Sequence, residues 1–205
     1  MKKFLLLFIV VLSLNAFAQS KTVGIKAGYY FPSDLKSGMI LGFDYGYRID
    51  ESVSIMFGTD FYYKSINEDV SHGEAEQLGV KIEQYQHLSQ WIGWHLPFTL
   101  KARVEIPIQD EAIKPFATAG LGYGFTHISY ENLEQKQSAS FTYNGFVWQL
   151  GGGIMFGLGS KSQLIVEALY NGASFDKDVS ETRFTTLNSS GFALRAGINF
   201  YLSKY

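Results

Sequence analysis

Close to its carboxyl end the chain reads Phe192-Ala-Leu-Arg-Ala-Gly-Ile-Asn-Phe-Tyr-Leu202, with an apolar residue at every second position. Side chains alternate between the two faces of a β-strand, so one face of this segment is wholly apolar and the other carries Arg195, Gly197 and Asn199. A tilted strand needs about 9–11 residues to cross the hydrocarbon core of a membrane. The segment therefore predicts a membrane-crossing strand with one face toward lipid.

Seven upstream segments repeat this alternation, at residues 22–31, 39–49, 53–64, 92–104, 116–126, 146–156 and 164–171. Bacterial membrane barrels have an even number of strands, and eight is the smallest number. The sequence therefore predicts an all-β protein, an eight-stranded antiparallel up-and-down transmembrane β-barrel. Pro97 interrupts the fourth segment. Because proline cannot donate a backbone hydrogen bond, we expect a bulge or a missing bond there.

The size of the side chains predicts which face points outward. An apolar face could also line the interior, as in a soluble lipocalin-like barrel. However, twelve of the thirteen glycines in the eight segments lie on the polar face, whereas the apolar face carries eighteen Phe, Tyr and Trp residues. The interior of an eight-stranded barrel is only just wide enough for its own side chains. We therefore expect the rings to face lipid and the glycines to face the lumen.

The charged residues of the eight segments all lie on the glycine face. They are Lys26, Asp44, Arg48, Asp60, Lys64, Lys101, Arg103, Glu167 and Arg195. A cation facing lipid at mid-depth costs about 2–4 kcal/mol, so a bilayer imposes this segregation. We expect the charges to pair inside the barrel, Glu167 with Arg195 and Asp44 with Lys26. A lumen filled in this way is plugged, and a small passive pore is the less favoured alternative.

Connection lengths and aromatic residues predict how the barrel sits in the membrane. The connections at 50–52, 105–114 and 157–163 are short, whereas those at 65–91, 127–145 and 172–191 are long and polar. Bacterial barrels have short periplasmic turns and long outer loops, so both termini are expected in the periplasm. Aromatic residues of the apolar face are candidates for the two interface girdles. They are Tyr29, Tyr45, Tyr47, Tyr63, Trp94, Tyr123, Trp148 and Tyr170.

The first 18 residues have the features of a cleaved secretory signal peptide. Lys2 and Lys3 precede an apolar run at 4–14, and Ala16-Phe17-Ala18 has the small-x-small cleavage pattern. Eleven apolar residues are too few for a membrane-spanning anchor. The remaining domain, residues 19–205, contains 15 basic and 19 acidic residues, a net charge of −4 that argues against a nucleic-acid partner. With no cysteine, a thiolate metal site is excluded.

Two neighbouring strands resemble a known family. The runs His95-Leu-Pro-Phe-Thr-Leu-Lys-Ala-Arg103 and Lys114-Pro-Phe-Ala-Thr-Ala-Gly120 are similar to the central strands of a Bacteroidota-type outer-membrane β-barrel domain family, which includes PorT-like proteins of type IX secretion. The layout also resembles OmpA/OmpX-type barrels. The resemblance implies a porin-like fold in the outer membrane, without a defined task. These proteins usually end on an aromatic residue in phase with the outer face, but Tyr205 is out of phase.

His127-Ile-Ser129 is the weak candidate for catalysis. Both side chains share the lipid-facing parity, and a His-x-Ser pair resembles the site of outer-membrane lipid A deacylases, in which a histidine base activates a serine. Tyr130 stands where that family has asparagine, and Phe141 where its acid falls. Glu131 and Glu134 are only nearby substitutes. A lipid A-modifying acyl hydrolase is therefore an alternative and not the main interpretation.

The acidic residues of the long connections lack the regular spacing of a calcium loop, so no metal or cofactor is expected. The favoured interpretation is a non-enzymatic outer-membrane barrel with a structural or binding role through its outer loops, or as an accessory subunit of an envelope complex. Expected partners are outer-membrane lipid, lipopolysaccharide and other envelope proteins.

Overall fold

The computed structural model describes residues 20–77, 80–108, 112–132, 137–176 and 186–203, and all regular structure within these ranges is β-strand. The strands are β1 (Ser20–Pro32), β2 (Gly38–Arg48), β3 (Val53–Gln77), β4 (Val80–Glu105), β5 (Ile113–Asn132), β6 (Gln137–Gly157), β7 (Ser162–Asp176), β8 (Thr186–Asn188) and β9 (Gly191–Ser203). Seven of the eight expected segments lie within one long strand each, and the segment 39–49 runs one residue past the end of β2. The expected signal peptide and Tyr205 lie outside the described residues.

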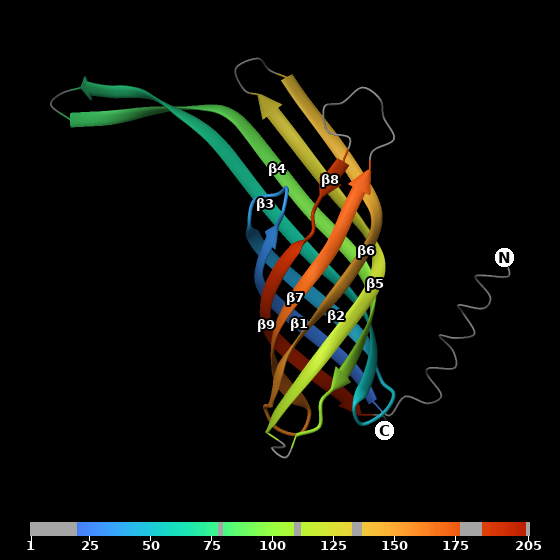
Figure 1. Ribbon diagram of the computed structural model, residues 1–205. Coiled ribbons are helices and arrows are strands. Elements are labelled where there is room, and N and C mark those ends of the chain that lie inside the picture. The colour runs from blue at the N-terminus through green and yellow to red at the C-terminus, as the bar shows by residue number, and fades with distance from the viewer. Residues whose placement is uncertain (1–19, 78–79, 109–111, 133–136, 177–185, 204–205) are drawn as a thin grey trace.

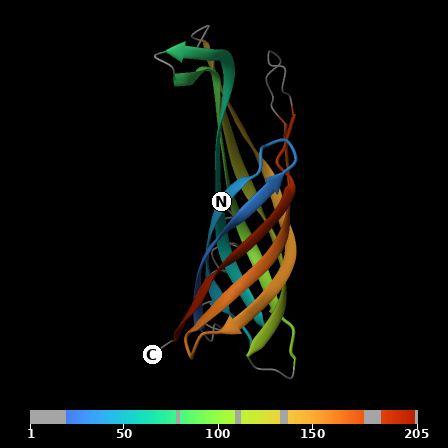
Figure 2. The same cartoon turned by 90° about the vertical axis from the view of Figure 1, so that its left-hand side faces the viewer.

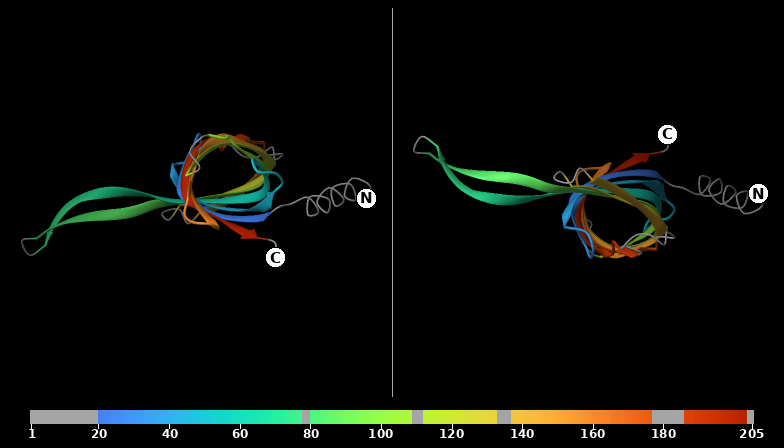
Figure 3. Two further views of the ribbon diagram at one scale, coloured as in Figure 1. Left: turned by 90° about the horizontal axis from the view of Figure 1, so that it is seen from below. Right: turned by 90° about the horizontal axis from the view of Figure 1, so that it is seen from above.

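The sheet closes on itself. Strands β1 to β7 pair antiparallel in chain order, and β9 pairs with both β7 and β1. The β1–β9 pairing runs without a break from Ser20 opposite Ser203 to Pro32 opposite Gly191. Figure 1 shows the tilted strands from the side, and Figure 3 shows the ring along its axis. The predicted eight-stranded antiparallel barrel is therefore confirmed, with β8 as a short addition to β7.

The barrel has two unlike ends. Strand β1 begins and β9 ends at what we call the termini end, where the turns that follow β2, β4 and β6 also lie (Figure 1). At the opposite end, which we call the loop end, the β3–β4 and β5–β6 hairpins extend beyond the barrel wall (Figures 1 and 2). The segments expected as short connections therefore lie at the termini end, and those expected as long connections lie at the loop end.

Apolar side chains cover the outside of the barrel, as expected. Met39, Leu121 and Phe192 are 66%, 61% and 61% exposed, whereas the intervening positions, such as Lys26 and Asp44, are 1% exposed. Soluble monomers rarely expose a contiguous apolar surface larger than a few hundred Å². A continuous apolar belt is instead what the lipid-facing side of a transmembrane barrel requires.

Glycines on the inner face allow the strands and the lumen side chains to pack closely. A Cβ on Gly122 would collide with the carbonyl oxygen of Phe98 on the neighbouring strand. A Cβ on Gly58 would lie 2.6 Å from Lys101 Nζ, inside the space that charged lumen side chains occupy. The glycine bias of the inner face therefore has a steric cause.

The long connections differ from the prediction. Residues 65–91, expected as a polar loop, mostly continue β3 and β4 as a paired hairpin, with register shifts at Glu68/Asp69 and Ser71/Glu74. Such irregularities bend a strand pair, and the hairpin curves away from the barrel axis in Figure 1. Much of 127–145 likewise belongs to the β5–β6 hairpin. The expectation of loops was wrong here because backbone pairing does not require an apolar face.

At Pro97 the ladder is interrupted without a bulge. Thr59 pairs with Phe98 and Tyr62 with His95 in the same register, but Asp60 and Phe61 between them have no pairing with β4. On its other side Pro97 pairs regularly with Gly124. The missing bond is thus confined to the β3 side, where the absent N–H would have pointed.

Candidate functional site

Ionised side chains fill the middle of the lumen. The cluster consists of Lys26, Asp44, Asp60, Lys101, Arg103, Glu167 and Arg195, each at most 3% exposed. These residues come from β1, β2, β3, β4, β7 and β9, so the cluster connects most of the barrel wall. Buried charges are tolerated only when they are paired and hydrogen-bonded. The charged residues occupy inward-facing positions on six strands, so they can pair inside the lumen. We call this cluster the lumen network.

Glu167 is the acceptor for two cations. Lys26 Nζ donates to Glu167 Oε1 at 2.8 Å, and Arg195 Nε donates to the same oxygen at 2.8 Å. Lys26 also contacts the carboxylate of Asp44. Both pairs that the alternation suggested, Glu167 with Arg195 and Asp44 with Lys26, are therefore present. They form one connected group and not two separate bridges.

Asp60 provides a second centre of the lumen network. It accepts hydrogen bonds from Arg195 Nη1 and, at 2.8 Å, from Gln149 Nε2. Lys101 Nζ lies 3.0 Å from Asp44 and 3.5 Å from Asp60, and so joins the two carboxylates. Gln149 was not among the expected network residues because it is uncharged. The position of Gln149 on the inner face of the segment 146–156 was the feature of the sequence that could have indicated a place in the lumen network.

Two of the nine expected lumen residues lie outside the network. Arg48 is near the termini end, where its Nη2 lies 3.4 Å from Glu105 Oε2 and its guanidinium is 5.7 Å from the Tyr201 ring centroid. Lys114 approaches the same Glu105 at 3.8 Å. Lys64 lies toward the loop end and lines a pocket described below. The alternation in the sequence predicted that both side chains lie on the inner face, but it did not predict their height along the barrel axis.

Apolar layers close the lumen network on both sides. Toward the termini end, Phe116, Met155 and Ile165 form a buried cluster, and the Arg103 guanidinium lies 4.8 Å from the Phe116 ring centroid. Toward the loop end there are two further buried clusters. They comprise Tyr30, Ile40, Tyr62 and Ala193, and Tyr143, Val147, Ala173, Phe175 and Leu187. The charges are therefore enclosed between hydrophobic layers.

His95 lies between the lumen network and the two apolar clusters toward the loop end. Its Nδ1 lies 2.7 Å from Thr126 Oγ1, and its ring lies 6.5 Å from that of Tyr30 and 5.9 Å from that of Phe175. The cavity beside these residues has a volume of about 10 Å³. This is about the space of one water molecule. The barrel interior at this height is packed with side chains.

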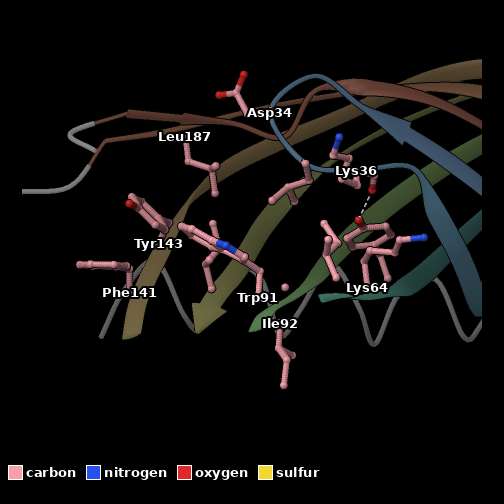
Figure 4. Close-up of a pocket in the computed structure, with 13 residues that line it drawn as sticks. Asp34, Lys36, Lys64, Trp91, Ile92, Phe141, Tyr143 and Leu187 are labelled. Atoms are coloured by element: carbon pink, nitrogen blue, oxygen red, sulfur yellow. Dashed lines mark hydrogen bonds between the residues drawn. The ribbon is translucent and has the colours of Figure 1, made fainter. Parts of the chain in front are cut away.

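A pocket of about 520 Å³ lies at the loop end, above the apolar layer. Its lining residues are Asp34, Leu35, Lys36, Tyr62, Lys64, Ile66, Trp91, Ile92, Gly93, Ile128, Phe141, Tyr143 and Leu187. Most of these side chains are aliphatic or aromatic, and several come from positions of inward parity on β3 to β6. We call it the mouth pocket (Figure 4).

The connection between β1 and β2 forms one wall and the floor of the mouth pocket. Ser33 N donates to Ser190 O at 2.8 Å and Asp34 N donates to Asn188 O at 3.0 Å, which holds this connection against the segment between β8 and β9. Leu35 packs against both apolar clusters of the upper layer. The floor of the pocket is therefore anchored by backbone hydrogen bonds and sealed by a leucine.

The polar and apolar linings of the mouth pocket are separated in space. In Figure 4, Lys36 and Lys64 lie on one side of the pocket, and Phe141 and Tyr143 lie on the opposite side. The Tyr62 hydroxyl donates to the Lys36 carbonyl oxygen. Asp34 Oδ2 accepts a hydrogen bond from Asn188 N at 2.7 Å. The pocket is thus amphipathic, with its two lysines at one end.

The His127–Ser129 pair is not assembled as a catalytic dyad. His127 Nδ1 lies 2.9 Å from Thr142 Oγ1, and its ring stacks on Trp94 with centroids 5.6 Å apart. Ser129 lies opposite Ser140 in the β5–β6 ladder. A nucleophile needs its base within hydrogen-bond reach and a third group to orient the base. Of the expected substitute acids, Glu131 is exposed and Glu134 lies outside the described residues.

The expected girdle aromatics lie on the outer face. Tyr45 and Tyr47 are toward the termini end of β2, and Tyr29 is toward the loop end of β1. Tyr63 and Trp94 pair with each other across the β3–β4 ladder. Tyr123 also points outward, with 47% of its surface exposed. Trp148 and Tyr170 form an aromatic contact with centroids 5.6 Å apart. Among the described residues, no group of three or more His, Asp or Glu side chains is arranged to hold a metal ion. The same residues contain no helix long and apolar enough to span a membrane.

Comparisons with known proteins support this description. The sequence matches the family described as outer membrane protein beta-barrel domain over residues 4–200. Among curated proteins, none matches the chain. Solved structures with a similar fold include a major outer membrane protein from Thermus thermophilus, at TM-score 0.59 and 14% identity, with 89% of this chain and 98% of that chain covered.

Two further solved barrels are similar. Neisserial surface protein A matches at TM-score 0.54 and 13% identity, and Ail, the attachment invasion locus protein of Yersinia pestis, matches at TM-score 0.52 and 13% identity. In both comparisons 89% of this chain and 97% of the other are covered. Ail has also been solved in complex with the heparin analogue sucrose octasulfate. At these identities the likeness concerns the fold alone.

Proposed function

Because the chain belongs to the outer membrane protein beta-barrel domain family, we propose that it is a non-enzymatic binding protein of the bacterial outer membrane. Its barrel is a closed membrane anchor, and its loop end carries the binding surface. This surface consists of the mouth pocket and of the β3–β4 and β5–β6 hairpins that extend beyond the wall. Expected partners are lipopolysaccharide and other envelope proteins.

The contrast between the two halves of the lumen carries the proposal. The middle of the barrel is filled by paired charges and closed by apolar layers on both sides. The loop end instead keeps a pocket of about 520 Å³ with an amphipathic lining. Eight-stranded barrels leave no open channel, so a pore is disfavoured, whereas a pocket of this size is in the range of small-molecule sites.

The same asymmetry of the two ends supports an orientation of the barrel in the membrane. We place the termini end in the periplasm and the loop end outside the cell, because bacterial barrels carry short periplasmic turns and long outer loops. The outward tyrosines and tryptophans then lie at the two interfaces, as girdles. Residues 1–18 act as a cleaved signal peptide in this scheme. Membership of a Bacteroidota-type, PorT-like subgroup remains part of the proposal and rests on the two strand motifs.

The solved complex of Ail with a heparin analogue supports a binding role for a barrel of this fold. It does not carry a ligand over to this chain, because the identity between the two chains is low. A lipid A hydrolase is the weaker alternative, since the partner of His127 is Thr142 and not a serine. If lipid A from cells expressing the wild-type protein lacked an acyl chain that cells expressing Ser129→Ala retained, the hydrolase would replace the binding role.

Trimming the β3–β4 hairpin tests the binding role directly. Val70 and Gln86 are register partners, so replacing residues 70–86 by Asn-Gly shortens the hairpin without shifting the remaining pairs. Unboiled and boiled protein should still migrate differently in detergent gels, because the barrel is intact. Capture of envelope partners from detergent extracts of native outer membranes should fall. Unchanged capture, or a stable conductance of the purified wild-type protein in planar bilayers, would contradict the proposal.

A further inference from the structure

The mouth pocket has the shape and lining of a site for an amphiphile. Its volume of about 520 Å³ is in the lower half of the range of roughly 300–1,000 Å³ found for small-molecule pockets. Such a space accommodates one apolar chain and not a lipid with several chains. The apolar part of the lining includes Ile66, Trp91, Ile128 and Leu187. Burial of apolar surface against these side chains is the main source of binding free energy available here.

Among the described residues, no ion pair balances the two lysines that line the pocket, Lys36 and Lys64. Asp34, the acidic residue of the lining, already accepts a hydrogen bond from a backbone amide, and its carboxylate points away from the pocket centre in Figure 4. Two ammonium groups on one side of an apolar pocket favour an anionic head group there.

We infer that the mouth pocket binds a single-chain anionic amphiphile, of which the carboxylate form of a long-chain fatty acid is the simplest member. The inference rests on the proposed function, because it places the ligand in the same pocket. The apolar chain lies against Ile66, Trp91 and Leu187, and the carboxylate lies beside Lys36 and Lys64. The ligand stays in the pocket because Leu35 and the layer beneath it close the way into the lumen.

Other ligand classes fit the pocket less well. A sugar needs several hydrogen-bonding groups on the wall, but the apolar side is formed by groups such as Ile66, Ile128 and Leu187. A cationic amphiphile would meet the two lysines at the polar end. A neutral apolar molecule would fill the volume without using the lysines. The charge of the head group therefore distinguishes the inferred ligand from its uncharged analogue.

Tryptophan fluorescence tests the inference with the full-length barrel in nanodiscs of neutral phosphatidylcholine. The chain has three tryptophans, so Trp94→Phe with Trp148→Phe leaves only Trp91, in the pocket. Trp91→Phe with Trp148→Phe leaves only Trp94, on the lipid-facing side. The probe is a long-chain fatty acid brominated in mid-chain, which quenches tryptophan on contact. Its methyl ester is the matched uncharged probe. Different gel migration of boiled and unboiled samples confirms that each variant is folded.

Quenching of Trp91 should saturate at a low ratio of fatty acid to lipid, whereas quenching of Trp94 should only follow partitioning into the membrane. Changing Lys36→Gln together with Lys64→Gln should weaken binding about threefold to tenfold, the effect of losing two exposed charge contacts. The methyl ester should bind more weakly than the acid by a similar factor. Lys161→Gln, which removes an exposed lysine at the opposite end of the barrel, should change nothing.

Three results would overturn the inference. Equal binding of acid and ester would show that the lysines do not select an anion. Parallel quenching of Trp91 and Trp94 would show that the probe partitions into the lipid only. Saturation of the pocket by an anionic phospholipid, added in place of the fatty acid, would assign the site to a membrane lipid. None of these results affects partner capture by the β3–β4 hairpin, so the broader proposal is tested separately.

Discussion

Arg195 and Glu167 are direct partners across the β9–β7 ladder, and the Arg195 guanidinium contacts Glu167 Oε1 through both Nε, at 2.8 Å, and Nη2, at 2.6 Å. Lys26 Nζ reaches the same oxygen from β1. One carboxylate thus joins three consecutive strands around the point where the barrel closes. Removing it leaves two buried cations without their shared acceptor.

Glu167→Gln should therefore lower the free energy of unfolding by about 3–5 kcal/mol, the usual cost of breaking a buried ion pair. Equilibrium unfolding in urea, in lipid vesicles, measures the change. The double variant Glu167→Gln/Arg195→Gln removes one charge of each sign, so its loss should be smaller than the sum of the two single losses. Strict additivity would show that the two residues are not coupled. Lys161→Gln, in an exposed turn, serves as the control.

Gly122→Ala should destabilise the barrel although it adds only one methyl group. The new Cβ would meet the Phe98 carbonyl oxygen, and a backbone atom of a paired strand cannot move aside as a flexible side chain can. We expect a loss of about 1–3 kcal/mol, measured by the same unfolding experiment. Gly157→Ala is the matched control, since nothing lies within 4 Å of its Cβ position. Equal stability of the two variants would contradict the steric role of the inner glycines.

Leu121→Lys places a cation on the lipid-facing side. Leu121 is 61% exposed and pairs with Leu100, which is 60% exposed, within the apolar belt. The expected cost is about 2–4 kcal/mol near the membrane mid-plane. Ile108→Lys, an exposed position beyond the end of β4, should cost less than about 1 kcal/mol because its ammonium reaches water. Similar costs at both positions would contradict the assignment of the belt to lipid.

Cysteine labelling tests the proposed orientation, because the chain contains no cysteine of its own. Ser138→Cys lies at the loop end of β6, and Ser160→Cys lies in the turn between β6 and β7. A membrane-impermeant maleimide should label the first variant in intact cells, and the second only after the outer membrane is permeabilised. The reverse pattern would place the termini end outside.

The membrane-spanning part of the fold could be predicted because a bilayer imposes a strict alternation. Every second residue of 192–202 is apolar. The same alternation in the other segments correctly predicted that the charged side chains face the lumen and that most aromatic rings face outward. The pairing of Glu167 with Arg195 followed from their parity and similar height. Gln149 and Glu105 were not expected as partners. Gln149 is uncharged, and Glu105 was expected in the connection 105–114, outside the pattern of charges on the strands.

The mouth pocket could not be predicted, because the types of residue at inward-facing positions change along the barrel axis. At the height of Lys26 inward positions are charged or small, but above Tyr62 they include Ile66, Trp91 and Ile128. Beyond the membrane the outer face is no longer required to be apolar, so apolar and polar residues no longer alternate regularly along the strand. A segment of this kind resembles a polar loop in sequence, although its backbone continues the strand ladder.

The seam between the first and last strands has a consequence for the order of assembly. Strand β1 is bordered on one side by β2, which follows it at once in the chain, and on the other by β9, the last of the described strands in chain order. Until β9 arrives, β1 and β7 both present an unpaired backbone edge, and Glu167 and Lys26 lack Arg195. The barrel can therefore close only when the last strand is in place, and a chain truncated before residue 191 would keep two strand edges with unpaired backbone groups.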